Sequence, residues 1–183
     1  MTARTRVTAL LVVCFEVWLY DQYSDLGAQF HFWLHSLFGG ALGVGALTVL
    51  RLVRRRRGGA VAPWESGWLG QLSSVFPDIL FLGFGVLHML WMDVFALHIT
   101  LHFVPRPLGT MWVLFTLALL AYGLAASGRP RPSLAVLVVL CGILTGALVA
   151  TPGPPDSIRE VRGHDGLALL CPVFTHPPGG SAH

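Results

Sequence analysis

The sequence feature that most constrains this chain is a series of long apolar blocks that contain few charged residues. The expected membrane spans within these blocks are residues 7–26, 29–53, 75–104, 109–127 and 133–150. A helix needs about 20 apolar residues to cross the hydrocarbon core of a bilayer. Charged residues make up only 11% of the chain, whereas an ordinary soluble domain has roughly 25%. We therefore expect an all-α, polytopic transmembrane helix bundle of about five spans, with the lipid bilayer as its main partner.

The positions of the basic residues predict an orientation. All twelve are Arg, and with a cytoplasmic N-terminus nine of them fall on the cytoplasmic side, as the positive-inside rule requires. This topology puts the C-terminus outside and predicts a multi-pass protein of the cell membrane. The Arg residues flank apolar blocks, where orientation signals belong, so we expect no nucleic-acid partner. Residues 1–150 form the expected bundle, and residues 151–183 form a Pro/Gly-rich external tail.

Two further segments carry structural expectations. Residues 58–71 are expected to form a cytoplasmic loop whose Trp64 and Trp68 rest at the membrane interface, the usual position of an amphipathic ring. Gly39 and Gly43 form a G-x-x-x-G motif in the second span. Such spacing allows helix backbones to approach closely, and we expect it to pack helices within the bundle.

Two H-x-x-x-H pairs mark the candidate site, because residues four positions apart lie on one face of a helix. By the expected topology, both pairs lie near the outer boundary of the membrane. Imidazole nitrogen and carboxylate oxygen together suit zinc first, and iron or manganese next. The candidate ligands are His31, His35, His98, His102 and one of Asp21 or Asp25.

A zinc ion at such a site would lower the pKa of bound water to about 7. Glu16, or Asp25 if it is not a ligand, is then the candidate general base. The alternative interpretation of these side chains is a structural polar network with ordinary interfacial and capping groups. Asp78 follows Pro77 at an expected helix start, where a carboxylate complements the helix dipole.

Three short segments carry a resemblance to a known family. They read L-H-S-L-F-G-G-A-L-G at 34–43, V-F-P-D at 75–78 and H-I-T-L-H at 98–102. In this order they resemble the membrane-bound, metal-dependent hydrolase family, whose pattern is T-H-x-x-x-G-x-x-x-G, F-P-D-x-D and H-R-G-x-T-H. The resemblance implies a metal-dependent hydrolase with four metal ligands: His35, Asp78, His98 and His102.

The chain departs from that pattern in three places. Leu80 stands where the family has its second loop acid, the last two histidines are four rather than five positions apart, and Arg-Gly is absent between them. A continuous third helix would also separate Asp78 from His98 by about 30 Å at 1.5 Å per residue. A shared metal therefore requires this segment to fold back.

These observations leave three functional hypotheses. The first is an integral plasma-membrane protein with an outward His/Asp metal site, acting as a hydrolase of a lipid or another membrane-embedded substrate. The second is a non-catalytic accessory or assembly subunit that binds a membrane protein partner or forms a homo-oligomer. The third is an electron-transfer protein with a b-type haem, in which His35 and one of His88 or His98 are the axial ligands.

Overall fold

The computed structural model describes residues 3–54, 61–84 and 90–151, and these residues form helices and no strands. The elements in chain order are α1 (Ala3–Asp25), α2 (Gln29–Arg54), α3 (Pro63–Phe84), η1 (Leu90–Val94), η2 (Thr100–Phe103), α4 (Pro107–Ala126) and α5 (Pro130–Val149). The all-α prediction is confirmed. Among the described residues, three helices are long and apolar enough to cross a membrane, namely α2, α4 and α5.

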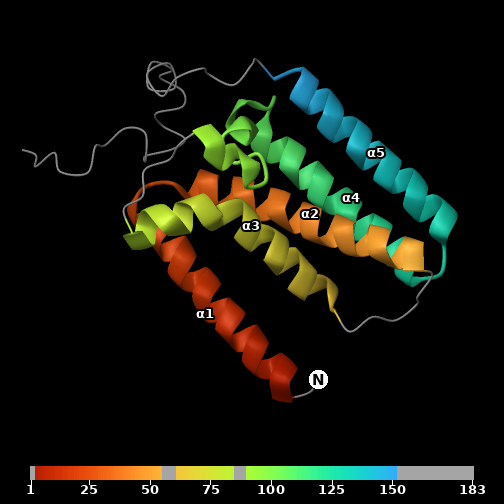
Figure 1. The fold of residues 1–183 in the computed structure, drawn as a ribbon, viewed down its shortest axis with the longest axis horizontal. Helices are drawn as coiled ribbons and strands as arrows, with labels where there is room; N and C mark the ends of the chain where they lie inside the picture. The colour runs from red at the N-terminus through yellow and green to blue at the C-terminus, as the bar shows by residue number, and fades with distance from the viewer. Residues whose placement is uncertain (1–2, 55–60, 85–89, 152–183) are drawn as a thin grey trace, which may run out of the picture.

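Helix α2 lies at the centre of the fold, between α3 and α4, and α5 packs on α4 (Figure 1). Large apolar side chains of α2 and α4, including Leu34, Phe38, Met111 and Leu114, form the main core. Gly128 follows the end of α4 with a positive φ of 76°, and Pro130 begins α5. Glycine after a helix and proline at a helix start are the usual arrangement. The result is a tight antiparallel α4–α5 hairpin.

The seam between α2 and α3 is built from glycines. A Cβ atom added at Gly43 would lie 1.9 Å from the carbonyl oxygen of Ser66, and one added at Gly70 would lie 2.1 Å from the carbonyl oxygen of Gly39. Ser66 also donates a hydrogen bond of 2.7 Å to the Gly43 carbonyl. The prediction that the G-x-x-x-G motif packs helices within the bundle is confirmed.

The expected third span is the main difference from the sequence analysis. Helix α3 begins at Pro63, so Trp64 and Trp68 lie in a helix rather than in a loop. It ends at Phe84, and the chain then forms η1 and η2, so the prediction of one helix over 75–104 is wrong. Pro77 lies inside α3 and cannot donate a backbone hydrogen bond; Figure 1 shows α3 changing direction along its length.

A compact turn replaces the last part of that expected helix. The Asp93 carboxylate accepts hydrogen bonds from the backbone N–H groups of Ile99 and Thr100, at 2.8 and 2.9 Å, and from the Thr100 hydroxyl at 2.6 Å. Ala96 and Leu97 adopt positive φ angles of 53° and 56°, which side-chain-bearing residues rarely do. This turn reverses the chain and returns residues 98–102 to α2 and α3.

Candidate metal centre

Five polar side chains from three separate segments meet at one end of α2. His31 and His35 come from the first turns of α2, Asp78 from α3, and His98 and His102 from the turn that follows η1 and from η2. All five are buried, with exposed fractions of 7% or less. Buried polar and charged groups are costly unless they are paired or bind a metal. This cluster therefore needs mutual contacts or a ligand.

The Asp78 carboxylate is the centre of the cluster. Its Oδ2 lies 3.0 Å from His31 Nε2, and its Oδ1 lies 3.3 Å from His98 Nε2. The Tyr23 hydroxyl, which comes from α1, donates a hydrogen bond to Asp78 Oδ2. Two imidazoles and one phenol therefore converge on a single carboxylate.

Ser74, one helical turn before Asp78, orients two of the histidines. Its carbonyl oxygen lies 2.9 Å from His98 Nδ1, and its hydroxyl lies 3.2 Å from His35 Nδ1. The Ser74 carbonyl accepts a hydrogen bond from Nδ1–H of His98, which leaves Nε2 of a neutral His98 as a lone-pair donor. A second partner that fixes one ring nitrogen and so orients the other is typical of metal-ligating histidines.

The ligand atoms of His31, His35, Asp78 and His98 all lie within 4.8 Å of one another. Tetrahedral zinc has metal–ligand bonds of about 2.0–2.1 Å, which places neighbouring ligand atoms roughly 3.4 Å apart. The contacts made by Asp78, at 3.0 and 3.3 Å, are close to this spacing. These four residues can hold a metal ion, and the donor set of three imidazoles and one carboxylate fits zinc.

The Asp78 carboxylate lies 3.0 Å from His31 Nε2 and 3.3 Å from His98 Nε2. Its negative charge therefore stabilises positive charge beside these two imidazoles. A bound metal ion would benefit from the same carboxylate.

The other predicted site residues occupy different places. His102 lies beside the four-residue group, with its Nε2 3.4 Å from His35 Nε2. Glu16 accepts hydrogen bonds from Trp68 at 3.0 Å and from Gln71 at 2.6 Å. Asp25 is exposed at the end of α1. The structure thus groups the predicted histidines with Asp78. The carboxylate beside them is that of Asp78 and not that of Asp21 or Asp25.

The fold also corrects the expected distance between Asp78 and His98. The estimate of about 30 Å assumed a straight helix at 1.5 Å per residue, whereas the two side chains lie 3.3 Å apart. The end of α3 at Phe84 and the turn held by Asp93 account for the difference. The segment folds back, as a shared metal requires.

Three residues at the site were missed by sequence reasoning. Tyr23 and Ser74 contact the ligands directly, and Asp93 holds the turn that presents His98. Ser74 and Asp78 are four positions apart and share one helix face. The expected span began at residue 75, so Ser74 fell outside it. The Tyr23 contact joins α1 to α3, and no local pattern in the sequence indicates it.

The haem hypothesis fits this geometry poorly. The rings of His35 and His98 stack with centroids 4.0 Å apart and an interplanar angle of 16°. Axial ligands approach haem iron from opposite faces of the porphyrin, and stacked rings at this distance leave no room for a macrocycle between them. The other proposed ligand, His88, lies outside the described residues.

Comparisons with protein-family models, with curated proteins and with solved structures find no match to this chain. The functional argument therefore rests on the geometry of the buried cluster and on the apolar helices that surround it.

Proposed function

We propose that this chain is a multi-pass plasma-membrane protein with an outward-facing divalent metal centre, and that it hydrolyses a lipid or another membrane-embedded substrate. The proposed metal is zinc, with iron or manganese next. The proposed ligands are His31, His35, Asp78 and His98. This assignment has the chemistry of the membrane-bound, metal-dependent hydrolases that the sequence resembles.

One observation carries the proposal: three imidazoles and one carboxylate converge in a buried site, with their ligand atoms within 4.8 Å of one another. His98 donates a hydrogen bond from Nδ1–H to the Ser74 carbonyl, which directs its Nε2 toward Asp78 Oδ1 at 3.3 Å. Either a proton or a metal cation can lie between these two atoms. His31 and His35 bring two further donors within the same 4.8 Å, and a single divalent cation can satisfy all four.

The outward direction of the site is supported by the charges at the opposite end of α2. Arg51 and Arg54 lie in the last turn of α2, and basic residues favour the cytoplasmic side. His31 and His35 lie in the first turns of the same helix. If the basic end is cytoplasmic, the cluster lies near the outer boundary of the membrane.

A bound zinc ion would supply Lewis acidity to polarise a carbonyl or phosphoryl oxygen and to acidify water. The chain's own residues hold and orient the ligands: Ser74 fixes the rings of His35 and His98, and Tyr23 fixes Asp78. The four proposed ligands are themselves buried, with exposed fractions of 2% or less, which limits their contact with bulk water. The predicted general bases, Glu16 and Asp25, lie outside the four-residue group: Glu16 is bonded by Trp68 and Gln71, and Asp25 is exposed at the end of α1.

The test is metal analysis of the detergent-purified full chain, together with hydrolysis of ester and phosphoester lipids in mixed micelles. We expect near-stoichiometric metal and metal-dependent hydrolysis in the wild type, and loss of both in His98→Ala and in Asp78→Ala. Thr48→Val is the matched control, because Thr48 is a buried polar residue of α2 that bonds the Val44 carbonyl. Equal metal content in all four proteins would contradict the metal centre, and metal without hydrolysis would contradict the enzymatic part.

The accessory-subunit alternative is favoured by the hydrogen bonds within the cluster. Tyr23 and His31 both contact Asp78 directly, as expected of a network that fixes helix register. Under this alternative, metal-free wild type is as stable as the metal-loaded protein. A rise in melting temperature on zinc addition that is absent in His98→Ala would decide against it.

A further inference from the structure

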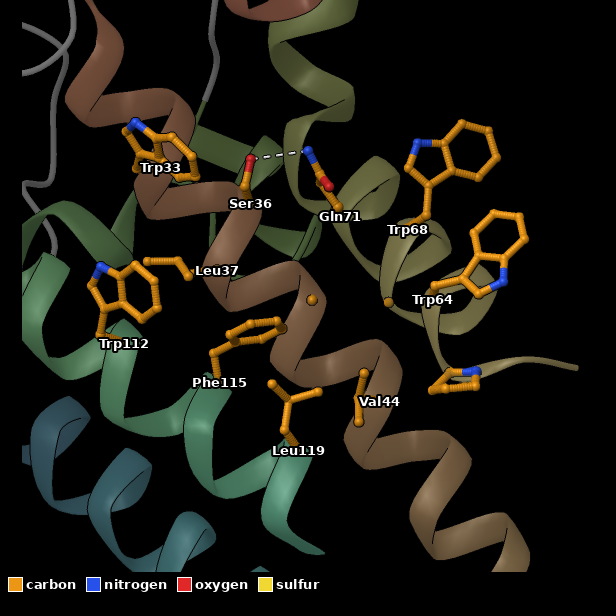
Figure 2. A pocket seen from close by; sticks show the side chains of 13 residues that line it. Trp33, Ser36, Leu37, Val44, Trp64, Trp68, Gln71, Trp112, Phe115 and Leu119 are labelled. Carbon is orange, nitrogen blue, oxygen red and sulfur yellow. Dashed lines mark hydrogen bonds between the residues drawn. The ribbon is translucent and has the colours of Figure 1, made fainter. Parts of the chain in front are cut away.

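A second feature, separate from the metal centre, is an apolar groove between α2, α3 and α4. It has a volume of about 490 Å³, within the usual range for small-molecule sites. Four tryptophans contribute to its lining, and Figure 2 shows Trp33 and Trp112 near one end and Trp64 and Trp68 on α3. Phe115 of α4 also lines it.

The setting of the groove makes hydrocarbon its expected occupant. Two of its three walls, α2 and α4, are helices apolar enough to cross a membrane, so the groove lies at the level of the lipid chains. Apart from the tryptophans, two lining side chains can form hydrogen bonds, namely Ser36 and Gln71. Gln71 bonds both the Ser36 hydroxyl, at 2.9 Å, and Glu16, at 2.6 Å. The polar groups thus already have protein partners, and the lining offers mainly apolar surface.

The length of the groove also matches a lipid chain. Along α2 its lining runs from Trp33 to Val44, which corresponds to roughly 16 Å at 1.5 Å per residue. The hydrocarbon core of a bilayer is about 30 Å thick. The groove therefore extends about as far as the acyl chain in one leaflet.

We propose that this groove binds one acyl chain of a membrane phospholipid, which lies along α2 between the tryptophans of α3 and α4. The acyl chain fills the space that the protein's own side chains leave open on the membrane-facing side. This inference does not depend on a metal at the His/Asp cluster. It predicts a bound lipid even in a protein whose cluster has been disabled.

Gly67 offers a way to close the groove. It lines the groove, and a Cβ atom added there would make only ordinary contact, 3.5 Å from a methyl group of Val44. The Cβ of a Gly67→Leu variant therefore meets no backbone atom closer than 3.9 Å, and we expect the rest of the side chain to occupy the groove. Gly123→Leu is the matched control, because Gly123 lies on α4 outside the groove lining and has no atom within 4 Å of an added Cβ.

The experiment is native mass spectrometry of the full chain released from nanodiscs of one phospholipid species. We expect one phospholipid adduct per chain in the wild type and in Gly123→Leu, and about tenfold less in Gly67→Leu. A phospholipid with a photoactivatable group in its acyl chain should crosslink to peptides of α2 and α4 in the wild type, and much less in Gly67→Leu.

Three outcomes would overturn the inference. They are a lipid-free wild type, equal adducts in Gly67→Leu and Gly123→Leu, and a wild-type dimer that Gly67→Leu converts to a monomer, since a second copy would then be the occupant. Metal content is measured in the same samples. Retained metal with lost lipid in Gly67→Leu separates a failure of the groove from a failure of the metal centre.

Discussion

The α2–α3 pair and the α4–α5 hairpin are both formed by helices adjacent in sequence, but their contacts differ in kind. In α2–α3 the backbones touch, and a Cβ added at Gly43 would lie 1.9 Å from a carbonyl oxygen of α3. In α4–α5, a Cβ added at Gly123 or Gly142 meets nothing within 4 Å. Large apolar side chains such as Leu120 and Val138 are 50% and 63% exposed there. The first pair is positioned by backbone contact, whereas the hairpin leaves apolar side chains exposed on helices that are apolar enough to cross a membrane.

The two regions also differ in their buried polar groups. The α2–α3 pair contains His31, His35, Ser74 and Asp78, all almost fully buried. In the hairpin, Ser133 is buried and bonds the Ala121 carbonyl at 2.8 Å. A site that needs ligand atoms fixed within fractions of an ångström is therefore found on the tightly packed pair. We expect substitutions there to disturb the site, and substitutions in the hairpin to be tolerated.

The largest effect is expected from Gly43→Leu. Its side chain collides with the Ser66 carbonyl of α3, and such overpacking should cost about 3 kcal/mol of unfolding free energy. Gly142→Leu in α5 should cost less than about 0.5 kcal/mol. Thermal unfolding in detergent measures both effects. Equal melting temperatures of the two variants would contradict the claim that α2–α3 is packed more tightly than the α4–α5 hairpin.

Asp93→Ala should have the next largest effect. It removes three hydrogen bonds that hold the turn before His98, at an expected cost of about 2 kcal/mol. Zinc affinity should fall about 10–100-fold because His98 is no longer held in place. The control is Thr116→Val in α4, which loses only a bond to the Trp112 carbonyl of the same helix. Unchanged zinc affinity in Asp93→Ala, measured by competition with a chelator, would contradict this role.

Tyr23→Phe tests the contact between α1 and the cluster. Loss of the hydrogen bond to Asp78 should cost about 1.5 kcal/mol, the value for a bond to a charged group. It should also weaken zinc binding about tenfold. Tyr20→Phe, an exposed tyrosine of the same helix, should change neither. Isothermal titration with zinc compares the two variants, and equal affinities would remove Tyr23 from the site.

The smallest effect is expected from Ser133→Ala in the hairpin. It removes the hydrogen bond to Ala121 and should lower the unfolding free energy by about 1 kcal/mol. Metal content should stay at the wild-type level. A loss of metal in this variant would show that the hairpin and the site are coupled more closely than their contacts indicate.

The sequence predicted the apolar helices well and the polar segment poorly. The expected spans 109–127 and 133–150 lie close to α4 and α5, because long apolar runs bounded by Pro and Arg have one plausible structure in lipid. The expected span over 75–104 failed because hydropathy does not record a reversal of chain direction. That reversal depends on the end of α3 at Phe84 and on the hydrogen bonds of Asp93 to Ile99 and Thr100.

The candidate site was predicted by residue type and not by geometry. The i, i+4 spacing selected His31 with His35 and His98 with His102, and the family resemblance added Asp78. Helical spacing could not show that Asp78 would reach His98, because it assumed a straight helix. It also could not separate Glu16, which bonds Trp68 and Gln71, from the cluster itself.

The most direct test of the metal centre is X-ray absorption spectroscopy at the zinc edge on the zinc-loaded full chain. We predict a first shell of nitrogen and oxygen at about 2.0–2.1 Å without sulfur, and outer-shell scattering from three imidazoles that weakens in His98→Ala. Zinc that is lost on dialysis, a sulfur shell at about 2.3 Å, or a spectrum unchanged in His98→Ala would contradict a centre formed by His31, His35, Asp78 and His98.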